Sequence, residues 1–205
     1  MQIFDGLPMI GGHPALDYVN SVEYRGRPEP GDRLTSFPHL VRWCLAAGIL
    51  SSKDAAIAQK GAAADAAAAG RTLRRASALR EAFLALLRMP ASRSILASPE
   101  FRLVARRLED ARAHAQLQYK SRTREFSWII PVRKPDDVLR RISASVGDFL
   151  VKQSGAVVRM CAGPNCDWMF IDRSHAKRRR WCQPAVCGNL VRVRRFRRPA
   201  SRYGT

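Results

Sequence analysis

The stretch Cys161-Ala-Gly-Pro-Asn-Cys166, joined by fifteen residues to Cys182-Gln-Pro-Ala-Val-Cys187, decides how the C-terminal part of this 205-residue chain folds. Each stretch has the spacing Cys-x4-Cys, and the turn-forming pairs Pro164-Asn165 and Gly188-Asn189 lie inside the first and directly after the second. Two close pairs of thiolates, each supplied by one turn, suit the tetrahedral coordination of zinc. A segment of about 45 residues cannot bury a sufficient core by itself, so a metal would supply much of its folding free energy.

We therefore predict one structural zinc ion, bound by Cys161, Cys166, Cys182 and Cys187. Two disulfides, or an iron centre of rubredoxin type, are the alternatives. Zinc is favoured because clustered cysteines in a reducing cytosol are more often metal ligands than disulfides. Four thiolates leave no open position for a catalytic water, and no pair of base and nucleophile lies nearby, so we do not predict an enzyme.

The charge of the chain points to an anionic partner. Lys and Arg number 36 against 17 Asp and Glu, a net charge of +19, and residues 161–205 contain 11 basic and 2 acidic residues. This excess favours nucleic acid or an acidic membrane surface, against the alternative of a solvated arginine-rich surface. No apolar run reaches the ~18–20 residues that span a bilayer, and the N-terminus lacks a signal-peptide pattern. We expect a cytoplasmic protein without a membrane partner.

Two basic runs are the candidate nucleic-acid contacts. The segment after Cys187 is predicted to form a helix that ends before Pro199. Its apolar side, with Leu190, Val193 and Phe196, is expected to pack on the aromatic residues of the zinc module, Trp168, Phe170 and Trp181. Its arginine side would then face phosphates and guanine edges. With the run before Trp181, the predicted contacts are Lys177, Arg178, Arg179, Arg180, Arg192, Arg194, Arg195 and Arg198.

The first 154 residues are predicted to form a mainly helical domain. Periodicity and capping residues indicate helices over 13–22, over 36–48, over 52–89 with a break at Gly61 or Gly70, and from Ser98 and Pro135. Ser52 is expected to cap the third of these. Two short strands are expected between residues 115 and 131. The inward residues expected include Leu40, Val41, Cys44, Leu45, Leu79, Phe83, Leu84, Val138, Leu139 and Ile142.

Near the N-terminus, His13, Asp17 and Asn20 recur at helical spacing, so a helix would align them on one face. One interpretation is a ligand pocket for an unidentified small-molecule effector. The other is a capped helix whose polar groups are satisfied by nearby backbone. No nucleophile accompanies the three residues, so hydrolysis is not predicted.

These motifs resemble a known pair of domains. The pattern Cys161-Ala-Gly-Pro-Asn-Cys166-Asp-Trp, Arg180-Trp-Cys182 and Val186-Cys187-Gly-Asn189, followed by an arginine-rich helix, resembles the CGNR zinc finger. The stretch from Gly11 to Asn20, Gly-Gly-His-Pro-Ala-Leu-Asp-Tyr-Val-Asn, is similar to the opening of the ABATE domain, which usually precedes that finger.

The resemblance covers most of the chain and implies a bacterial "putative stress-induced transcription regulator". In such proteins the finger is presumed to bind DNA and the N-terminal domain to sense a ligand or bind a partner. The expected fold is mainly α with a short β-hairpin: an ABATE-like domain over 1–154 and a small treble-clef-like zinc finger over 155–205. Leu190 departs from the family motif, which has Arg there. Either a nucleic-acid contact of the family is lost here, or the Arg braces the fold and Leu190 replaces it with packing, which is the interpretation we favour.

The first functional hypothesis is thus a zinc-containing transcription regulator that contacts DNA. The alternatives are an RNA-binding module and a protein-interaction adaptor whose zinc is only a structural clip. A small-molecule enzyme centred on the His13–Asn20 face is the weakest. The sequence leaves the oligomeric state open.

Overall fold

The N-terminal segment folds into short paired strands around one short helix. The computed structural model describes residues 2–25, 28–90 and 94–197. Antiparallel pairing joins β1 (Ile3–Phe4) to β2 (Leu7–Pro8) and β3 (Val22–Glu23) to β4 (Gly31–Asp32), and α1 (Pro14–Val19) lies between the two pairs in the chain. The helix expected over 13–22 is therefore shorter than predicted, because its last residue enters a strand.

Longer helices form the body of the domain, as the periodicity predicts. They are α2 (Phe37–Ala46), α3 (Ser52–Ala64), α4 (Ala66–Arg88), α5 (Pro99–Ala113) and α6 (Pro135–Lys152). The predicted caps are confirmed for α2 and α5: Ser36 accepts a hydrogen bond from the His39 amide, and Ser98 from the Phe101 amide. No helix in the described part of the chain is long and apolar enough to cross a membrane.

The alanine-rich region differs from its prediction in two places. Ser51, rather than Ser52, caps α3 through a reciprocal capping box with Asp54. The helix breaks at Asp65, whose carboxylate accepts a hydrogen bond of 2.7 Å from the Ala68 amide and starts α4. The short aspartate side chain can accept hydrogen bonds from the free amides at the start of a new helix. Glycine allows the backbone to bend but has no side chain that could cap these amides. Gly61 stays inside α3. A Cβ at this position would lie 3.4 Å from Pro135 of α6, so the close packing of the two helices explains the glycine.

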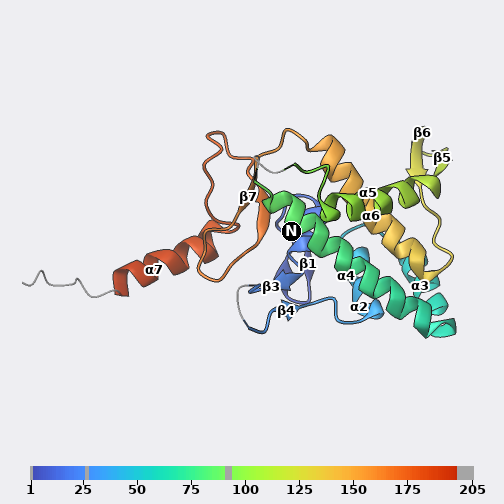
Figure 1. The fold of residues 1–205 in the computed structure, drawn as a ribbon, viewed down its shortest axis with the longest axis horizontal. Helices are drawn as coiled ribbons and strands as arrows, with labels where there is room; N and C mark the ends of the chain where they lie inside the picture. The colour runs from blue at the N-terminus through green and yellow to red at the C-terminus, as the bar shows by residue number, and fades with distance from the viewer. Residues whose placement is uncertain (1, 26–27, 91–93, 198–205) are drawn as a thin grey trace, which may run out of the picture.

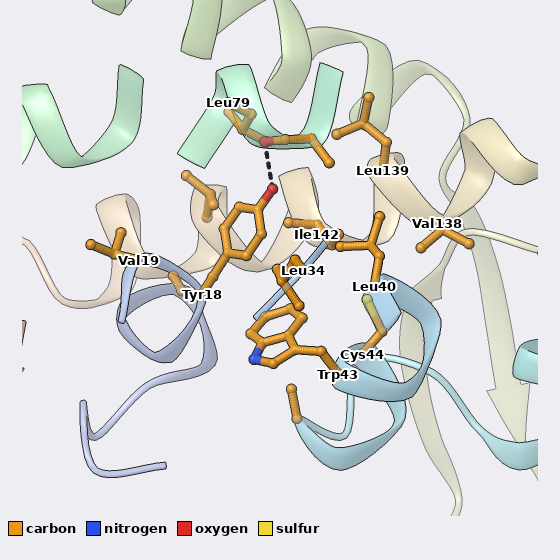
Figure 2. Close-up of a cluster of buried hydrophobic side chains, with 14 of the residues drawn as sticks. Tyr18, Val19, Leu34, Leu40, Trp43, Cys44, Leu79, Val138, Leu139 and Ile142 are labelled. Carbon is orange, nitrogen blue, oxygen red and sulfur yellow. Dashed lines mark hydrogen bonds between the residues drawn. The ribbon is translucent and has the colours of Figure 1, made fainter. Parts of the chain in front are cut away.

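The main core lies where α1, α2, α4 and α6 meet (Figure 1). Tyr18 and Trp43 are its largest fully buried side chains, with ring centroids 5.1 Å apart, and the Tyr18 hydroxyl donates to the Ala76 carbonyl at 2.5 Å (Figure 2). Leu45 was expected inside but is exposed. Trp43 and Leu45 are about 200° apart on a helix, so burying Trp43 turns Leu45 outward. The other inward residues named above are buried: Leu40, Val41, Cys44, Leu79, Phe83, Leu84, Val138, Leu139 and Ile142.

An ion pair between a buried arginine and a partly exposed aspartate holds the β3–β4 strands against α4. Arg80 is buried and donates to both carboxylate oxygens of Asp32, at 3.0 and 2.5 Å, and to the Ser21 hydroxyl at 2.9 Å. A buried guanidinium without partners would be costly. The N-terminal strands therefore pack in the place that satisfies Arg80.

Two β-hairpins and a last helix follow in the C-terminal half. Their elements are β5 (Gln116–Lys120), β6 (Glu125–Ile129), β7 (Val158–Met160), β8 (Met169–Ile171), the π-helix η1 (Pro184–Gly188) and α7 (Asn189–Arg197). The strands predicted between 115 and 131 are confirmed as β5 and β6, with Tyr119 opposite Phe126. The basic helix is confirmed as α7, which extends away from the rest of the molecule at the opposite end from the β5–β6 hairpin (Figure 1).

Strand β8 connects the C-terminal module to the helical domain. Met169 and Ile171 belong to the main core, whereas Phe170, on the other face, packs in a second cluster with the cysteines. The Ile171 amide donates to the Gly11 carbonyl at 2.9 Å. The division of the chain into two domains at residues 154 and 155 stays a prediction. Strand β8 of the C-terminal module contributes Met169 and Ile171 to the main core and Phe170 to the cysteine cluster.

Candidate metal centre and nucleic-acid interface

The four predicted cysteines come together in one cluster. The Sγ atoms of Cys161, Cys166, Cys182 and Cys187 all lie within 4.8 Å of one another. The Cys166–Cys182 and Cys182–Cys187 sulfurs are 3.7 and 3.6 Å apart, far beyond the ~2.05 Å of a disulfide. Four sulfurs at about 2.3 Å from a tetrahedral zinc ion would lie about 3.8 Å apart. The spacing of the sulfurs thus fits one zinc ion.

Local backbone geometry brings the sulfurs together. The first pair flanks the turn between β7 and β8, and the second flanks the turn that leads into α7. Asn165 adopts a left-handed conformation with φ of 61°, which asparagine tolerates better than most residues. Gly163 is required because a Cβ there would lie 2.9 Å from the Cys187 Cβ and 3.3 Å from the Cys161 sulfur.

The hydrogen bonds of the cluster favour a thiolate at Cys161. The Cys161 sulfur accepts from the amides of Gly163 and Cys182, both at 3.3 Å. Hydrogen bonds from the thiols of Cys166 and Cys182, with these amides, hold the pKa of Cys161 far below its usual value. Sharing protons with Cys161 raises the pKa values of Cys166 and Cys182, and burial raises the pKa of Cys187. Without a metal, only the Cys161 thiolate is favoured. A bound divalent cation would stabilise the negative charge of all four cysteine thiolates.

Aromatic side chains pack around the cysteines, not under the helix. Phe170 is fully buried beside them, and Trp168 and Trp181 are partly buried in the same cluster. The predicted packing of the α7 apolar side on these rings is wrong. Leu190 is 49% and Phe196 91% exposed, and Val193 is exposed as well. The physical reason is that α7 starts directly at the cluster and extends away from the rest of the molecule, which leaves its apolar side only partly covered (Figure 1).

Asp172 organises the loop that carries the first basic run. Its buried carboxylate accepts hydrogen bonds from the Ser174 amide and hydroxyl at 3.0 and 2.6 Å, the Arg179 amide at 2.8 Å and the Arg159 guanidinium at 3.0 Å. Burial by itself would raise the pKa of Asp172, but these hydrogen bonds outweigh it and hold the pKa below the usual range. The ionised carboxylate thereby fixes the path of residues 173–179. Sequence reasoning missed this role, since a lone aspartate in a basic loop carries no pattern.

The predicted nucleic-acid residues divide into two groups. Lys177 and Arg179 bind the protein itself. Lys177 donates to the Asp172 carbonyl, while Arg179 donates to the Trp181 and Cys182 carbonyls and lies 4.6 Å above the Phe170 ring. These two residues brace the cluster.

The remaining basic residues are more open to a partner. Arg178, Arg192 and Arg194 are exposed, and their side chains form no hydrogen bond or ion pair with other described residues. Arg180 is exposed and lies 5.6 Å above the Trp181 ring. Arg195 lies within α7, and Arg198 lies outside the described residues. At least four exposed guanidinium groups are therefore present on this module.

The three predicted N-terminal residues, His13, Asp17 and Asn20, contact the protein's own backbone. The His13 ring accepts from the Ala15 amide and caps α1, and burial lowers its pKa. Asp17 accepts from the Gly11 amide at 2.8 Å, and burial raises its pKa to about 6. Asp17 and Asn20, but not His13, line a cavity of about 20 Å³, which is room for about one water molecule. A small-molecule role for the trio stays a prediction.

Asn20 makes the contact between the two parts of the chain that sequence reasoning missed. Its amide nitrogen donates to the Met169 carbonyl at 2.9 Å, and its amide oxygen accepts from the Met169 amide at 2.7 Å. Both backbone groups of one β8 residue are thus paired by a single side chain from the end of α1. Arg173 adds a hydrogen bond to the Gly12 carbonyl at 3.1 Å.

Comparison with known proteins agrees with these two parts. The family model of the CGNR zinc finger matches residues 158–199. The model of the ABATE family, described as "Putative stress-induced transcription regulator", matches residues 12–153. No curated protein matches the chain.

Proposed function

This chain belongs to the ABATE family and carries a C-terminal CGNR zinc finger, and from that premise we propose that it regulates transcription by binding duplex DNA through the finger. The observation that carries the proposal is the set of exposed guanidinium groups on the finger: Arg178, Arg180, Arg192 and Arg194. They lie in a segment with 11 basic and 2 acidic residues. Such a surface attracts the phosphates of DNA.

In this proposal the four cysteines hold a zinc ion whose role is structural. When bound, zinc would link the β7–β8 turn to the start of α7, and four thiolates would leave no open coordination position. The positive charge of Arg179, which lies against Phe170 and donates to the Cys182 carbonyl, would offset part of the negative charge of the thiolates. The zinc cluster thereby orients α7 and leaves the outward arginines available for DNA.

The N-terminal domain orients the finger and is the candidate partner or effector module. The Asn20–Met169 hydrogen bonds and the shared strand β8 connect the two. These contacts are the route by which a change in the α1 region would reach the strand that borders the cysteine cluster. This part of the proposal, like the cytoplasmic location, is supported by the family's description as a regulator.

The test is duplex affinity across a salt series, measured by fluorescence anisotropy with the intact, zinc-loaded protein. Arg192→Ala/Arg194→Ala should weaken binding and reduce the slope of log affinity against log salt by about 2, because each lost phosphate contact releases about one counterion less. Arg74→Ala/Arg106→Ala removes the same charge from exposed arginines of α4 and α5 and should leave the slope unchanged. No binding at low salt, or equal effects of the two double variants, would refute DNA binding by the finger. Stronger competition by structured RNA than by duplex DNA would favour the RNA-binding alternative.

A further inference from the structure

One face of the β5–β6 hairpin presents large apolar side chains to solvent. Leu117 pairs with Trp128 across the strands, and Tyr119 with Phe126. Directly paired residues of antiparallel strands share a face, so all four lie together. Trp128 is 71% and Phe126 69% exposed, and the rings of Tyr119 and Phe126 are 4.9 Å apart. We call these four residues the hairpin platform.

The hairpin platform is not part of the core. The hairpin projects from the helical body beyond α5, at the opposite end of the molecule from α7 (Figure 1). Isolated exposed apolar residues are common, but a contiguous group of three aromatic residues and a leucine marks an interaction site. An exposed apolar edge is also a hazard for aggregation, which natural proteins counter with charge.

The charge around the platform is predominantly positive. Residues 112–134 contain one acidic residue, Glu125, and six basic ones: Arg112, Lys120, Arg122, Arg124, Arg133 and Lys134. Lys120, Arg122 and Arg124 form the exposed tip and make no side-chain hydrogen bond or ion pair with other described residues. At the base of the hairpin, the basic residues Arg133, Lys134 and Arg140 line a cavity of about 340 Å³ together with His114 and with Asp137, which pairs with Arg140. The platform thus has cationic groups at both ends.

We infer that the β5–β6 hairpin is a binding site for single-stranded nucleic acid. Bases stack on Tyr119, Phe126 and Trp128, and the basic tip and base contact the phosphates. Every base has a flat face that stacks on an aromatic ring, and basic groups beside such rings follow the backbone of the strand. In a duplex these faces are covered by neighbouring bases, so the platform suits a single strand.

A second copy of the chain fits the platform less well. A net charge of +19 opposes self-association, and the basic residues would face one another. An aromatic side chain buries about 150–250 Å² at most, so four partly covered side chains offer less than the ~800 Å² per partner of a standard interface. Charge and size together favour a polyanion with exposed bases.

The inference is independent of the finger's function, because the two sites lie at opposite ends of the molecule (Figure 1). Its test therefore uses the full chain carrying Arg192→Ala/Arg194→Ala, so that the finger contributes little binding. Fluorescence anisotropy of a labelled oligothymidylate reports on the hairpin platform. A labelled duplex, tested with the finger arginines restored, reports on the finger.

Phe126→Ala/Trp128→Ala should weaken oligothymidylate binding by at least tenfold, since stacking contributes about that factor per base. The control Gln118→Ala/Ser127→Ala alters a cross-strand pair on the opposite face and should leave the affinity unchanged. Trp128→Phe keeps a ring and should retain most of the binding. Arg122→Ala/Arg124→Ala should reduce the salt slope by about 2.

The outcomes separate the alternatives. Equal thermal unfolding midpoints for the variants and the unmodified protein would exclude misfolding. We expect them to be equal because the substituted side chains are exposed. Equal oligothymidylate affinities of the platform and control variants would overturn the inference. So would a platform variant that changes only the sedimentation mass, because that result assigns the face to self-association. Loss of duplex binding by the finger variant alone would leave the inference intact.

Discussion

Gly163 is the residue at which the cysteine cluster is most crowded. A Cβ at this position would lie 2.9 Å from the Cys187 Cβ, 3.1 Å from the Cys187 sulfur and 3.3 Å from the Cys161 sulfur. The first of these distances is shorter than real carbon contacts allow, so one half of the cluster would have to move. At the scale of single residues, then, the absence of a side chain is as important to the metal centre as the sulfurs.

Gly163→Ala should loosen the metal centre. We expect zinc to be lost to a chelator at least tenfold faster than from the unmodified protein, because two ligand positions are displaced. The measurement is zinc release followed with a colorimetric chelator. Gly155→Ala is the matched control, since a Cβ there meets nothing within 4 Å. Equal release rates for the two variants would contradict the assigned ligands.

Asp17 gives the molecule a pH dependence of known sign. Burial raises its pKa to about 6, so the folded state binds its proton more tightly than the unfolded state, where the pKa is about 4. The contribution of Asp17 to stability is therefore largest below about pH 4 and falls, by up to about 3 kcal/mol, as the pH rises to about 6. Asp17→Asn keeps an oxygen that can accept from the Gly11 amide and removes the titration.

Denaturant unfolding at several pH values checks this expectation. The free energy of unfolding of the unmodified protein, minus that of Asp17→Asn, should fall between about pH 4 and 6 and then level off. Comparing the two proteins at each pH cancels the titration of the other carboxylates and of the cysteines. A difference that is constant, or that rises with pH, would show that Asp17 is not protonated in the folded state near pH 5.

At the scale of elements, α7 is an amphipathic helix without a covered side. Its apolar residues Leu190, Val193 and Phe196 are exposed, and its arginines Arg192 and Arg194 are exposed on other sides. The expectation that Leu190 replaces the family arginine with packing is therefore wrong. The side chain lies in the first turn of α7 and is 49% exposed, so either residue type fits the position.

Leu190→Arg should restore the family motif at little cost. We expect the free energy of unfolding to change by less than about 0.5 kcal/mol, because the position is exposed. Duplex affinity at low salt should rise, with a salt slope steeper by about 1. Leu96→Arg adds the same charge at an exposed position far along the chain and serves as control. An equal rise in affinity for both variants would mean that net charge, rather than the finger, determines binding.

At the scale of the whole molecule, the helical domain and the finger share strand β8. Met169 and Ile171 pack in the main core while Phe170 packs beside the cysteines, and Asn20 pairs both backbone groups of Met169. The two parts that the family models match separately are thus connected by buried contacts.

Asn20→Ala should destabilise the zinc-loaded protein by about 2–4 kcal/mol, because it leaves a buried amide and a buried carbonyl of Met169 without partners. Denaturant unfolding measures the effect. Gln59→Ala truncates an exposed amide on α3 and should change stability by less than about 0.5 kcal/mol. If Asn20→Ala behaved like Gln59→Ala, the two parts would not be coupled through this residue.

Local patterns account for the parts that could be predicted. The spacing of the cysteines, the caps Ser36 and Ser98, and the alternation in β5 and β6 each depend on residues close together in the chain. Turn and capping chemistry act over three or four residues, so the sequence by itself determined these features. The family resemblance extended them to the whole chain.

Only the tertiary structure decided what depends on residues far apart. Asn20 meets Met169 across 149 positions, and Arg80 meets Asp32 across 48. The sequence alone does not state which buried polar group pairs with which, because many partners satisfy a hydrogen bond equally well. In the same way, the exposure of Leu190 follows from the direction in which α7 leaves the cysteine cluster, not from the helix's own periodicity. Short-range chemistry therefore determined the elements and the metal site, and long-range packing decided which surfaces remain for a partner.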